Sequence, residues 1–366
     1  MKLAILVDQP HWTGIGIYAV ELYKLLKTYF DDVKLIYAGA VEDDQQYYLY
    51  RPYLRRTRVL LRRPSVIRRN YRAILRDRSL DSYLFHYAGT DFFPLRRREG
   101  VITIHDLIED RLLPSVRFGF LKVLVTLERR RKYSETLRLA PMATEIITIS
   151  NKTRNELKVL TGLESTVIYH WIVGDRFRER DRAQSIRELS LKEEFRYFLA
   201  VGNDRGNKRI DLLKKFSDSL PSQYRLVKIG APIDSQRAIN VGRVNSYLYP
   251  LYFNASSAYV HLSDDEGFGI PLLEALGSKV PIICRKTSIN MEVLNDAAIY
   301  IREESINKQI SSIIKETESE KFIDEIKRKM TERIKAFSPK LAAEKYIEVY
   351  FKSLSKLKSL EHPNSL

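Results

Sequence analysis

The sequence predicts an α/β protein built from two Rossmann-like, doubly wound domains. At 366 residues the chain has the length of two domains of ordinary size. Short apolar runs, typical of buried parallel strands, alternate with amphipathic segments that have helical spacing. This alternation begins at Lys2–Val7 and begins again at Tyr197–Val201. Gly174-Asp175 and the mixed-charge stretch 176–187 have the composition of a hinge. We therefore expect one domain over residues 1–174 and another over residues 175–337.

The composition indicates a soluble globular protein in a reducing compartment. Hydrophobic residues make up 44% and charged residues 30% of the chain, and the mean hydropathy is −0.30. No apolar run approaches the ~18 residues of a membrane span. The N-terminus is predicted to be a first strand and not a signal peptide. The single cysteine, Cys284, rules out a disulfide within the chain, so we expect a cytoplasmic protein.

The charge balance is strongly basic. The chain has 62 Lys and Arg against 46 Asp and Glu, a formal net charge of +16. Such an excess favours nucleic acid, anionic lipid headgroups or phosphorylated small molecules as partners. Residues 51–78 alone hold eleven arginines and one acid, Asp77. This segment has the character of a helix on an anionic membrane, of a phosphate-backbone contact, or of a solvated basic surface.

Two glycines precede the first predicted helix. The strand Lys2–Val7 leads through a polar loop to Gly14 and Gly16, and the helix is predicted over Ile17–Thr28. With Ala19 these glycines match the dinucleotide-binding fingerprint. In that fingerprint, however, the first glycine directly ends the strand, whereas six residues separate Val7 from Gly14. A dinucleotide-dependent oxidoreductase therefore stays an alternative.

The most informative stretch is the loop and helix start at residues 266–277, between predicted strands Tyr259–Leu262 and Val280–Cys284. Glycines let backbone N–H groups approach a ligand closely. The first amides of a helix and its dipole favour a bound anion, typically phosphate. The loop and helix start consist of Gly267, Phe268, Gly269, Ile270 and Pro271. We therefore expect a phosphate-binding turn here, with Pro271 at the first helical position.

Two carboxylates flank this turn. Glu266 comes directly before it, and Glu274 follows eight residues later, expected in the first helical turn. Carboxylates that faced a bound phosphate would repel it, so they fit better as acceptors for hydroxyl groups on either side of the phosphate. A ligand with hydroxyls, phosphate and further hydroxyls in that order is a sugar nucleotide.

A histidine follows another predicted strand. Val101–Ile104 ends at His105, and ligands of open α/β sheets bind at the carboxyl ends of strands. His105 is therefore a candidate for chemistry. His86 and His170 also follow apolar runs, and we expect them to be packing residues.

The run E-G-F-G-I-P-L-L-E-A-L-G, from Glu266 to Gly277, resembles the Glu-x7-Glu signature of retaining glycosyltransferases of family four, the glycosyl transferases group 1. The resemblance implies the GT-B fold, in which two Rossmann-like domains face each other across a cleft. It also implies that the C-terminal helix, predicted over residues 340–357, crosses back to complete the first domain. That first domain would bind the acceptor, and the second would bind the nucleotide sugar.

The resemblance also implies roles for single residues. Glu266 would orient the hydroxyls of the transferred sugar, and Glu274 those of the ribose. Lys208 matches a lysine that clasps the donor diphosphate together with the amides of residues 267–270. Asn203 stands where the family commonly has an arginine, and Arg205 offers a charge two residues later. His105 would contact the donor sugar, and the loop with Gly14 and Gly16 would face its phosphates.

The expected function is transfer of a sugar from a UDP- or GDP-linked donor to a glycan, lipid-linked or protein-linked acceptor, with retention of configuration. No cofactor and no metal are expected, because Asp264-Asp265 fit a turn better than a metal site. The segment 51–78 would contact an anionic membrane, which implies a peripheral position on its inner face. Recognisable nucleic-acid modules are absent from the sequence, so no nucleic acid is expected. A basic nucleic-acid-binding protein stays the second alternative.

Overall fold

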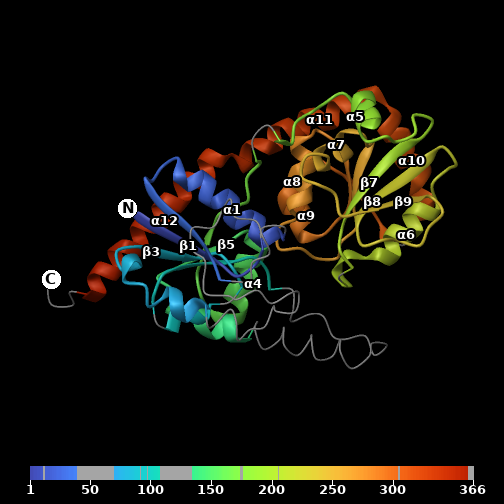
Figure 1. The fold of residues 1–366 in the computed structure, drawn as a ribbon. Helices are drawn as coiled ribbons and strands as arrows, with labels where there is room; N and C mark the ends of the chain where they lie inside the picture. The colour runs from blue at the N-terminus through green and yellow to red at the C-terminus, as the bar shows by residue number, and fades with distance from the viewer. Residues whose placement is uncertain are drawn as a thin grey trace. The chain divides into compact units, whose positions relative to one another are not determined.

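The computed structural model describes residues 1–10, 13–38, 70–90, 92–96, 98–107, 134–173, 176–204, 206–303 and 306–361 (Figure 1). The chain divides into two compact units. The N-terminal unit holds Met1–His170 together with Lys340–Leu366, and the C-terminal unit holds Trp171–Pro339. Three features named above lie outside the described residues: Gly174-Asp175, Arg205 and residues 51–69 of the arginine-rich segment.

Each unit contains a six-stranded sheet in which every described pairing is parallel, and this confirms the predicted α/β fold class. In the N-terminal unit the strand order is β2-β1-β3-β4-β5-β6. These strands are β1 (Lys2–Val7), β2 (Asp32–Tyr37), β3 (Leu84–Tyr87), β4 (Val101–Ile104), β5 (Glu145–Thr148) and β6 (Thr166–Val167). The helical elements described with them are α1 (Gly14–Lys27), η1 (Arg78–Leu80), η2 (Phe93–Arg96), η4 (Ala140–Met142), α4 (Asn151–Thr161) and α12 (Pro339–Glu361).

The order in the C-terminal unit is β12-β11-β10-β7-β8-β9. Its strands are β7 (Arg196–Gly202), β8 (Tyr224–Gly230), β9 (Ala238–Gly242), β10 (Ala258–His261), β11 (Ile282–Arg285) and β12 (Ile299–Ile301). Its described helices are α5 (Arg182–Glu188), η6 (Gly206–Lys208), α6 (Ile210–Asp218), α7 (Tyr249–Asn254), α8 (Ile270–Gly277), α9 (Ser288–Leu294), α10 (Ile306–Glu318), α11 (Glu320–Ile334) and η8 (Lys335–Phe337).

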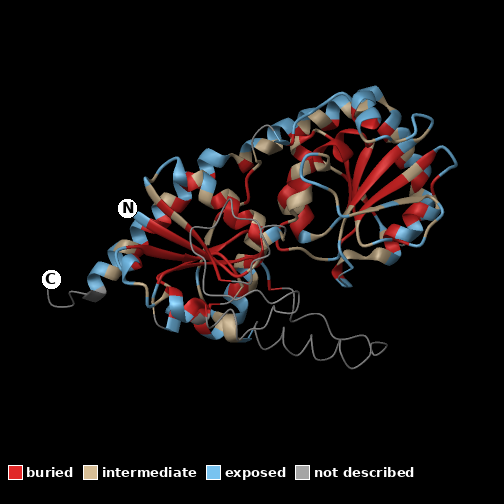
Figure 2. Ribbon diagram, in the orientation of Figure 1, coloured by how far each residue is buried: buried red, intermediate tan, exposed pale blue. Residues whose placement is uncertain are grey.

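The strands are buried because helices cover both faces of a parallel sheet. Leu3, Ala4, Ile5 and Leu6 of β1 have no exposed surface, which is why this strand is a continuous apolar run in the sequence. Figure 2 shows most strands of both units in the colour of buried residues; the edge strands β6 and β9 are more exposed.

Helix α1 begins at Gly14, three residues before the expected start at Ile17. The side chain of Thr13 caps it, since Thr13 Oγ1 accepts a hydrogen bond from the amide of Gly16 over 3.1 Å. Gly14 and Gly16 therefore lie in the first turn of the helix, and not in a loop before it.

The last helix, α12, is anchored to the N-terminal unit by buried tyrosines. The hydroxyl groups of Tyr346 and Tyr18 lie 2.8 Å apart, and the hydroxyl of Tyr350 lies 2.8 Å from Nδ1 of His86. Each contact joins residues more than 260 positions apart in the sequence. Buried hydroxyls need such partners, so these contacts fix the helix against the sheet.

In the C-terminal unit the strand order reverses between β7 and β10, the first strand of each half of the sheet. Ligands of doubly wound sheets bind outside the carboxyl ends of the strands at this reversal. The residues that follow these two strands are 203–209 and 262–269, so the fold alone places both predicted donor-binding segments at one edge.

The stretch 176–187 differs from the expected hinge, because it contains helix α5. The side chain of Asp181 accepts a hydrogen bond from the amide of Gln184 over 2.6 Å and caps this helix, and Ile186 is buried. The mixed charges are the exposed side of an amphipathic helix. No helix within the described ranges combines the length and the apolarity needed to cross a bilayer.

Candidate active site

The turn before α8 is built around Gly269. Its φ of +92° lies in the left-handed region, and a Cβ atom there would lie 2.9 Å from Cδ1 of Leu272. Glycine is therefore required at this position. Helix α8 then begins at Ile270, so Pro271 is the second helical residue and not the first as expected. Phe268 is buried and packs edge-on against Phe337, with ring centroids 5.8 Å apart.

The amides of this turn are available to an anion. Within the described part of the chain, the N–H groups of Gly267, Gly269 and Ile270 have no hydrogen-bond acceptor, and the first internal bond of the helix runs from Leu272 N to Gly269 O over 2.8 Å. Unpaired amides at a helix start, together with the helix dipole, favour negative charge.

Glu266 lies in a charged and polar environment. Lys208 of η6 donates a hydrogen bond to Glu266 Oε1, and His261 Nε2 of β10 lies 3.9 Å from the same oxygen. Burial acts to raise the pKa of this carboxyl group. Lys208, His261 and a hydrogen bond with Ser263 outweigh burial and lower that pKa below its usual value. Glu266 is therefore ionised at neutral pH.

Glu274 lies in a different environment. It is the fifth residue of α8, in the second turn and not the first as expected. The hydroxyl of Tyr249 donates a hydrogen bond to Glu274 Oε2 over 2.7 Å. Burial raises the pKa of Glu274 to about 7, although Tyr249 and the charge of Arg176 both act to lower that pKa. The two carboxyl groups thus have opposite pKa shifts, a common feature of functional sites.

Asn207 holds the segment after β7 to the segment after β10. The side-chain amide of Asn207 donates to the backbone carbonyl of Asp265 over 2.7 Å, and the backbone carbonyl of Asn207 accepts from the backbone amide of Asp264 over 2.8 Å. This brings Lys208 beside Glu266. Asn203 is exposed at the start of the same segment.

Lys228 is a site residue that the sequence analysis missed. It is fully buried in β8, and its ammonium group donates to the carbonyls of Gly202 (2.6 Å) and Ile229 (2.8 Å). Burial and the nearby charge of Lys208 lower the pKa of Lys228 to about 8. A single lysine inside the otherwise apolar run Leu226–Ile229 is the sequence signal that could have revealed it.

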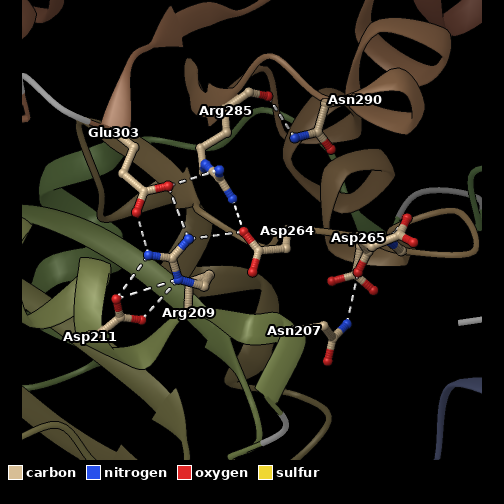
Figure 3. A network of polar contacts seen from close by, with 9 residues as sticks. Asn207, Arg209, Asp211, Asp264, Asp265, Arg285, Asn290 and Glu303 are labelled. Atoms are coloured by element: carbon tan, nitrogen blue, oxygen red, sulfur yellow. Dashed lines mark hydrogen bonds and ion pairs between the residues drawn. The ribbon is translucent and has the colours of Figure 1, made fainter. Parts of the chain in front are cut away.

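An ion-pair network holds Asp264. Figure 3 shows Arg209 and Arg285 among the carboxylates of Asp211, Asp264 and Glu303. Arg209 Nη1 lies 3.0 Å from Asp264 Oδ1, and Arg285 pairs with the same oxygen. Asp264 is thus held by two guanidinium groups, which agrees with its predicted place in a turn. Among the described residues, no group of three or more His, Cys, Asp and Glu is arranged to hold a metal ion.

His105 belongs to the N-terminal unit. Its Nε2 lies 3.0 Å from the carbonyl of Ala88, and its ring packs edge-on against Tyr18 at 4.8 Å. Burial lowers the pKa of His105 to about 4, so the ring is neutral at pH 7. Because a carbonyl only accepts, Nε2 carries the proton and Nδ1 is an acceptor. Gly14 is exposed at the start of α1, and the amide of Gly16 is taken by Thr13.

His86 and His170 are buried, as expected for packing residues. His86 Nε2 lies 2.8 Å from Thr103 Oγ1.

Of the predicted site residues, the structure brings Glu266, Lys208 and the turn amides together in the C-terminal unit. His105 and the two glycines belong to the N-terminal unit.

The comparisons with known proteins agree with this geometry. A family model described as glycosyl transferases group 1 matches residues 181–330, the range that contains Lys208, Glu266 and Glu274. This part of the chain is thus similar to the glycosyl transferases group 1. It is 27% identical over 246 residues to the O-antigen chain mannosyltransferase RfbU of Salmonella typhimurium, an alignment that spans 62% of each chain. The match thus covers less than two thirds of that relative.

Solved structures of two glycosyltransferase-like proteins share the fold of this chain, which is of the GT-B type. A sucrose-phosphate synthase from Thermosynechococcus elongatus superposes with a TM-score of 0.76 at 15% identity, over 97% of this chain and 100% of that one. Anabaena HepE in complex with UDP-glucose superposes with a TM-score of 0.69 at 15% identity, over 95% of this chain and 98% of that one. At such identities the likeness establishes the fold alone.

Proposed function

We propose that this chain transfers a sugar from a nucleotide diphosphate sugar to an acceptor, with retention of the anomeric configuration. The observation that carries the proposal is the arrangement in the C-terminal unit. Free amides at the start of α8 and the ammonium group of Lys208 offer positive charge. The carboxyl group of Glu266 pairs with Lys208, and that of Glu274 lies one turn further along α8, where it accepts from the hydroxyl of Tyr249. The UDP-glucose bound to the relative HepE is a ligand of this class.

The chemical demand is stabilisation of the leaving diphosphate. The bond between the anomeric carbon and the diphosphate oxygen breaks, a bond to the acceptor oxygen forms, and the acceptor proton passes to the leaving diphosphate. Donors already aimed at the developing charge are the most effective catalysts of such a step. Each charge-assisted hydrogen bond contributes about 1.5–3 kcal/mol, and the helix dipole adds ~1 kcal/mol.

Each site residue has a proposed task. Lys208 and the amides of residues 267–270 bind the diphosphate, with Asn203 and Arg205 from the same donor-binding segment. Glu266 orients the hydroxyls of the transferred sugar, and Glu274 accepts the ribose hydroxyls. The acceptor nitrogen of neutral His105 fits a hydroxyl of the transferred sugar, and the turn with Gly14 and Gly16 accommodates the donor phosphates.

The acceptor is proposed to bind the N-terminal unit. The relative RfbU is by its name an O-antigen chain mannosyltransferase, and this supports a glycan or lipid-linked acceptor. The arginine-rich segment 51–78 would then hold the enzyme to anionic lipid on the cytoplasmic face of a membrane. Co-sedimentation with vesicles tests this placement, since it predicts retention on anionic lipid and release from neutral lipid.

Calorimetric screening tests the function. The purified chain is titrated with UDP-, GDP- and ADP-sugars, with NAD and with a DNA oligomer. We expect one of the UDP- or GDP-sugars to bind with micromolar to millimolar affinity and to be hydrolysed slowly or transferred. Binding of NAD or of DNA without binding of any nucleotide sugar contradicts the proposal and supports one of the two alternatives raised by the sequence.

A further inference from the structure

The proposed function requires Lys208 to leave its present partner. In this structure its ammonium group donates to Glu266, and both side chains are mostly shielded, with 20% and 13% exposure. A lysine that binds a diphosphate turns toward the anion, which attracts it more strongly than a single carboxylate does. Glu266 then loses its strongest hydrogen bond at the moment when it must hold the sugar.

A second donor lies beside Glu266 on β10. His261 is 4% exposed, and its Nε2 is fully buried with no hydrogen-bond partner among the described residues. This atom lies 3.9 Å from Glu266 Oε1, about 1 Å beyond an ordinary hydrogen bond. A buried polar atom without a partner is costly, so such atoms call for an explanation.

The tautomer of His261 follows from its two neighbours. Burial lowers the pKa of His261 to about 4, so its ring is neutral at pH 7 and carries one proton. Tyr259 places its hydroxyl 3.1 Å from Nδ1. If Tyr259 donates to Nδ1, the proton lies on Nε2 and is directed at the side that carries Glu266. The opposite tautomer would set the lone pair of Nε2 against a carboxylate, which is unfavourable.

The local charges favour an exchange of partners. Glu266 raises the pKa of His261, and Lys208 lowers it. Lys208 also lowers the pKa of the buried Lys228. Movement of Lys208 toward an added anion relieves both repulsions and strengthens the attraction between His261 and Glu266. Ser263 stays as the other hydrogen-bond partner of Glu266.

We propose that His261 is a positioning residue for Glu266: when Lys208 turns to the donor diphosphate, the Nε2–H group of His261 replaces Lys208 as the hydrogen-bond donor to the Glu266 carboxylate. This inference rests on the proposed function, because it requires a bound diphosphate and a sugar held by Glu266. His261 acts through Glu266 and does not itself touch the donor.

The test compares the affinity for a nucleotide sugar with that for the same nucleotide without its sugar. The probes are UDP-glucose against UDP and GDP-mannose against GDP, measured by calorimetry on the full chain. His261→Asn keeps a polar side chain but places its N–H group near the Nδ1 position, whereas His261→Gln places it near Nε2. We expect His261→Asn to lose ~10-fold or more in affinity for the sugar-bearing probe alone, and His261→Gln to keep it.

The same pair of variants is followed in turnover. We expect kcat to fall ~10-fold to ~100-fold in His261→Asn and to recover in His261→Gln, while the melting temperatures of the two variants agree. The 15N NMR signal of His261 Nε2–H, identified by its loss in His261→Gln, should shift downfield when the sugar-bearing probe is added to the wild-type protein.

The outcomes separate the inference from the function. If the wild-type protein binds no nucleotide sugar, the proposed function fails, and the inference fails with it. If the wild-type protein binds and turns over a nucleotide sugar but His261→Asn behaves like His261→Gln, the function stands and the inference is wrong. A loss of UDP or GDP affinity equal to the loss of sugar-nucleotide affinity also overturns the inference, since it would indicate a general structural defect.

Discussion

The hydroxyl of Tyr249 in α7 donates a hydrogen bond to Oε2 of Glu274 in α8 over 2.7 Å, yet burial raises the pKa of Glu274 to about 7. The carboxyl group is therefore partly protonated at neutral pH. Only the ionised form offers both oxygens as acceptors to a pair of ribose hydroxyls. Under the proposed function, donor binding should for that reason depend on pH near neutrality.

The affinity for the nucleotide sugar should rise between pH 6 and pH 8. A ligand that binds the ionised carboxylate gains up to about tenfold in affinity per pH unit on the acid side of the pKa. The diphosphate of a nucleotide sugar has no ionisation in this range, so the ligand itself does not cause the slope. Calorimetry at several pH values measures the slope. Glu274→Gln should bind more weakly and without this slope; an unchanged slope in that variant would disprove the assignment.

The ionisation of Glu274 should change the stability of the fold in the opposite direction: stability falls as the pH rises. Its folded-state pKa lies above the ordinary value of 4.5, so the folded protein binds more protons than the unfolded chain between these values. Its stabilising contribution is complete below about pH 4.5 and is lost as the pH rises toward 7. Urea unfolding of wild type and Glu274→Gln should show this as a difference that grows with pH, and a constant difference would count against it.

Lys208→Met should destabilise the protein by about 1–3 kcal/mol, because Glu266 would lose its charged partner in a mostly buried place. The double variant Lys208→Met/Glu266→Gln should recover most of this loss without recovering donor binding. Thermal unfolding of the wild type, the two single variants and the double variant forms a double-mutant cycle for stability, and calorimetry of the same proteins measures donor binding. Additive stability changes would show that the pair does not interact.

Gly269→Ala should destabilise the protein by about 1–3 kcal/mol and weaken nucleotide binding. The position combines a φ of +92° with a Cβ contact of 2.9 Å to Leu272. Gly162→Ala is the matched control, since Gly162 has a φ of +74° and nothing within 4 Å of its Cβ position. The control should lose about 1 kcal/mol and no binding. Equal effects of the two variants on binding would rule out a special role for the turn.

Lys228→Met should change how the stability of the protein depends on pH, because it removes a buried titratable group. The folded-state pKa of Lys228, about 8, is below its ordinary value of 10.5. The unfolded chain therefore binds more protons between these values, so this lysine favours stability above pH 10.5 and loses that contribution as the pH falls toward 8. The stability of wild type relative to Lys228→Met, from urea unfolding, should rise from pH 8 to pH 10. A flat difference would mean that Lys228 is not shielded.

The sequence predicted the fold and the turn before α8 because both depend on local signals. The apolar runs at β1 and β4 match the strands in full, and Gly269 with Pro271 marked the start of α8. The neighbours of the two glutamates could not be predicted from the sequence. Tyr249 reaches Glu274, and His261 lies near Glu266, only because of how the strands and helices pack. Lys228 was missed for a related reason, because its carbonyl partners are recognisable only once β7 and β8 pair.

Helix α12 also constrains the order in which the two units can finish folding. The N-terminal unit needs Tyr346 and Tyr350 to complete the hydrogen bonds of Tyr18 and His86, yet these residues leave the ribosome after the whole of Trp171–Pro339. The C-terminal unit is continuous in sequence, so all of its residues are synthesised before the N-terminal unit receives its last helix. During synthesis, therefore, the unit that is translated first finishes folding last. Until α12 is made, the surface of the N-terminal unit that this helix covers stays exposed, and a chaperone has most to protect at that stage.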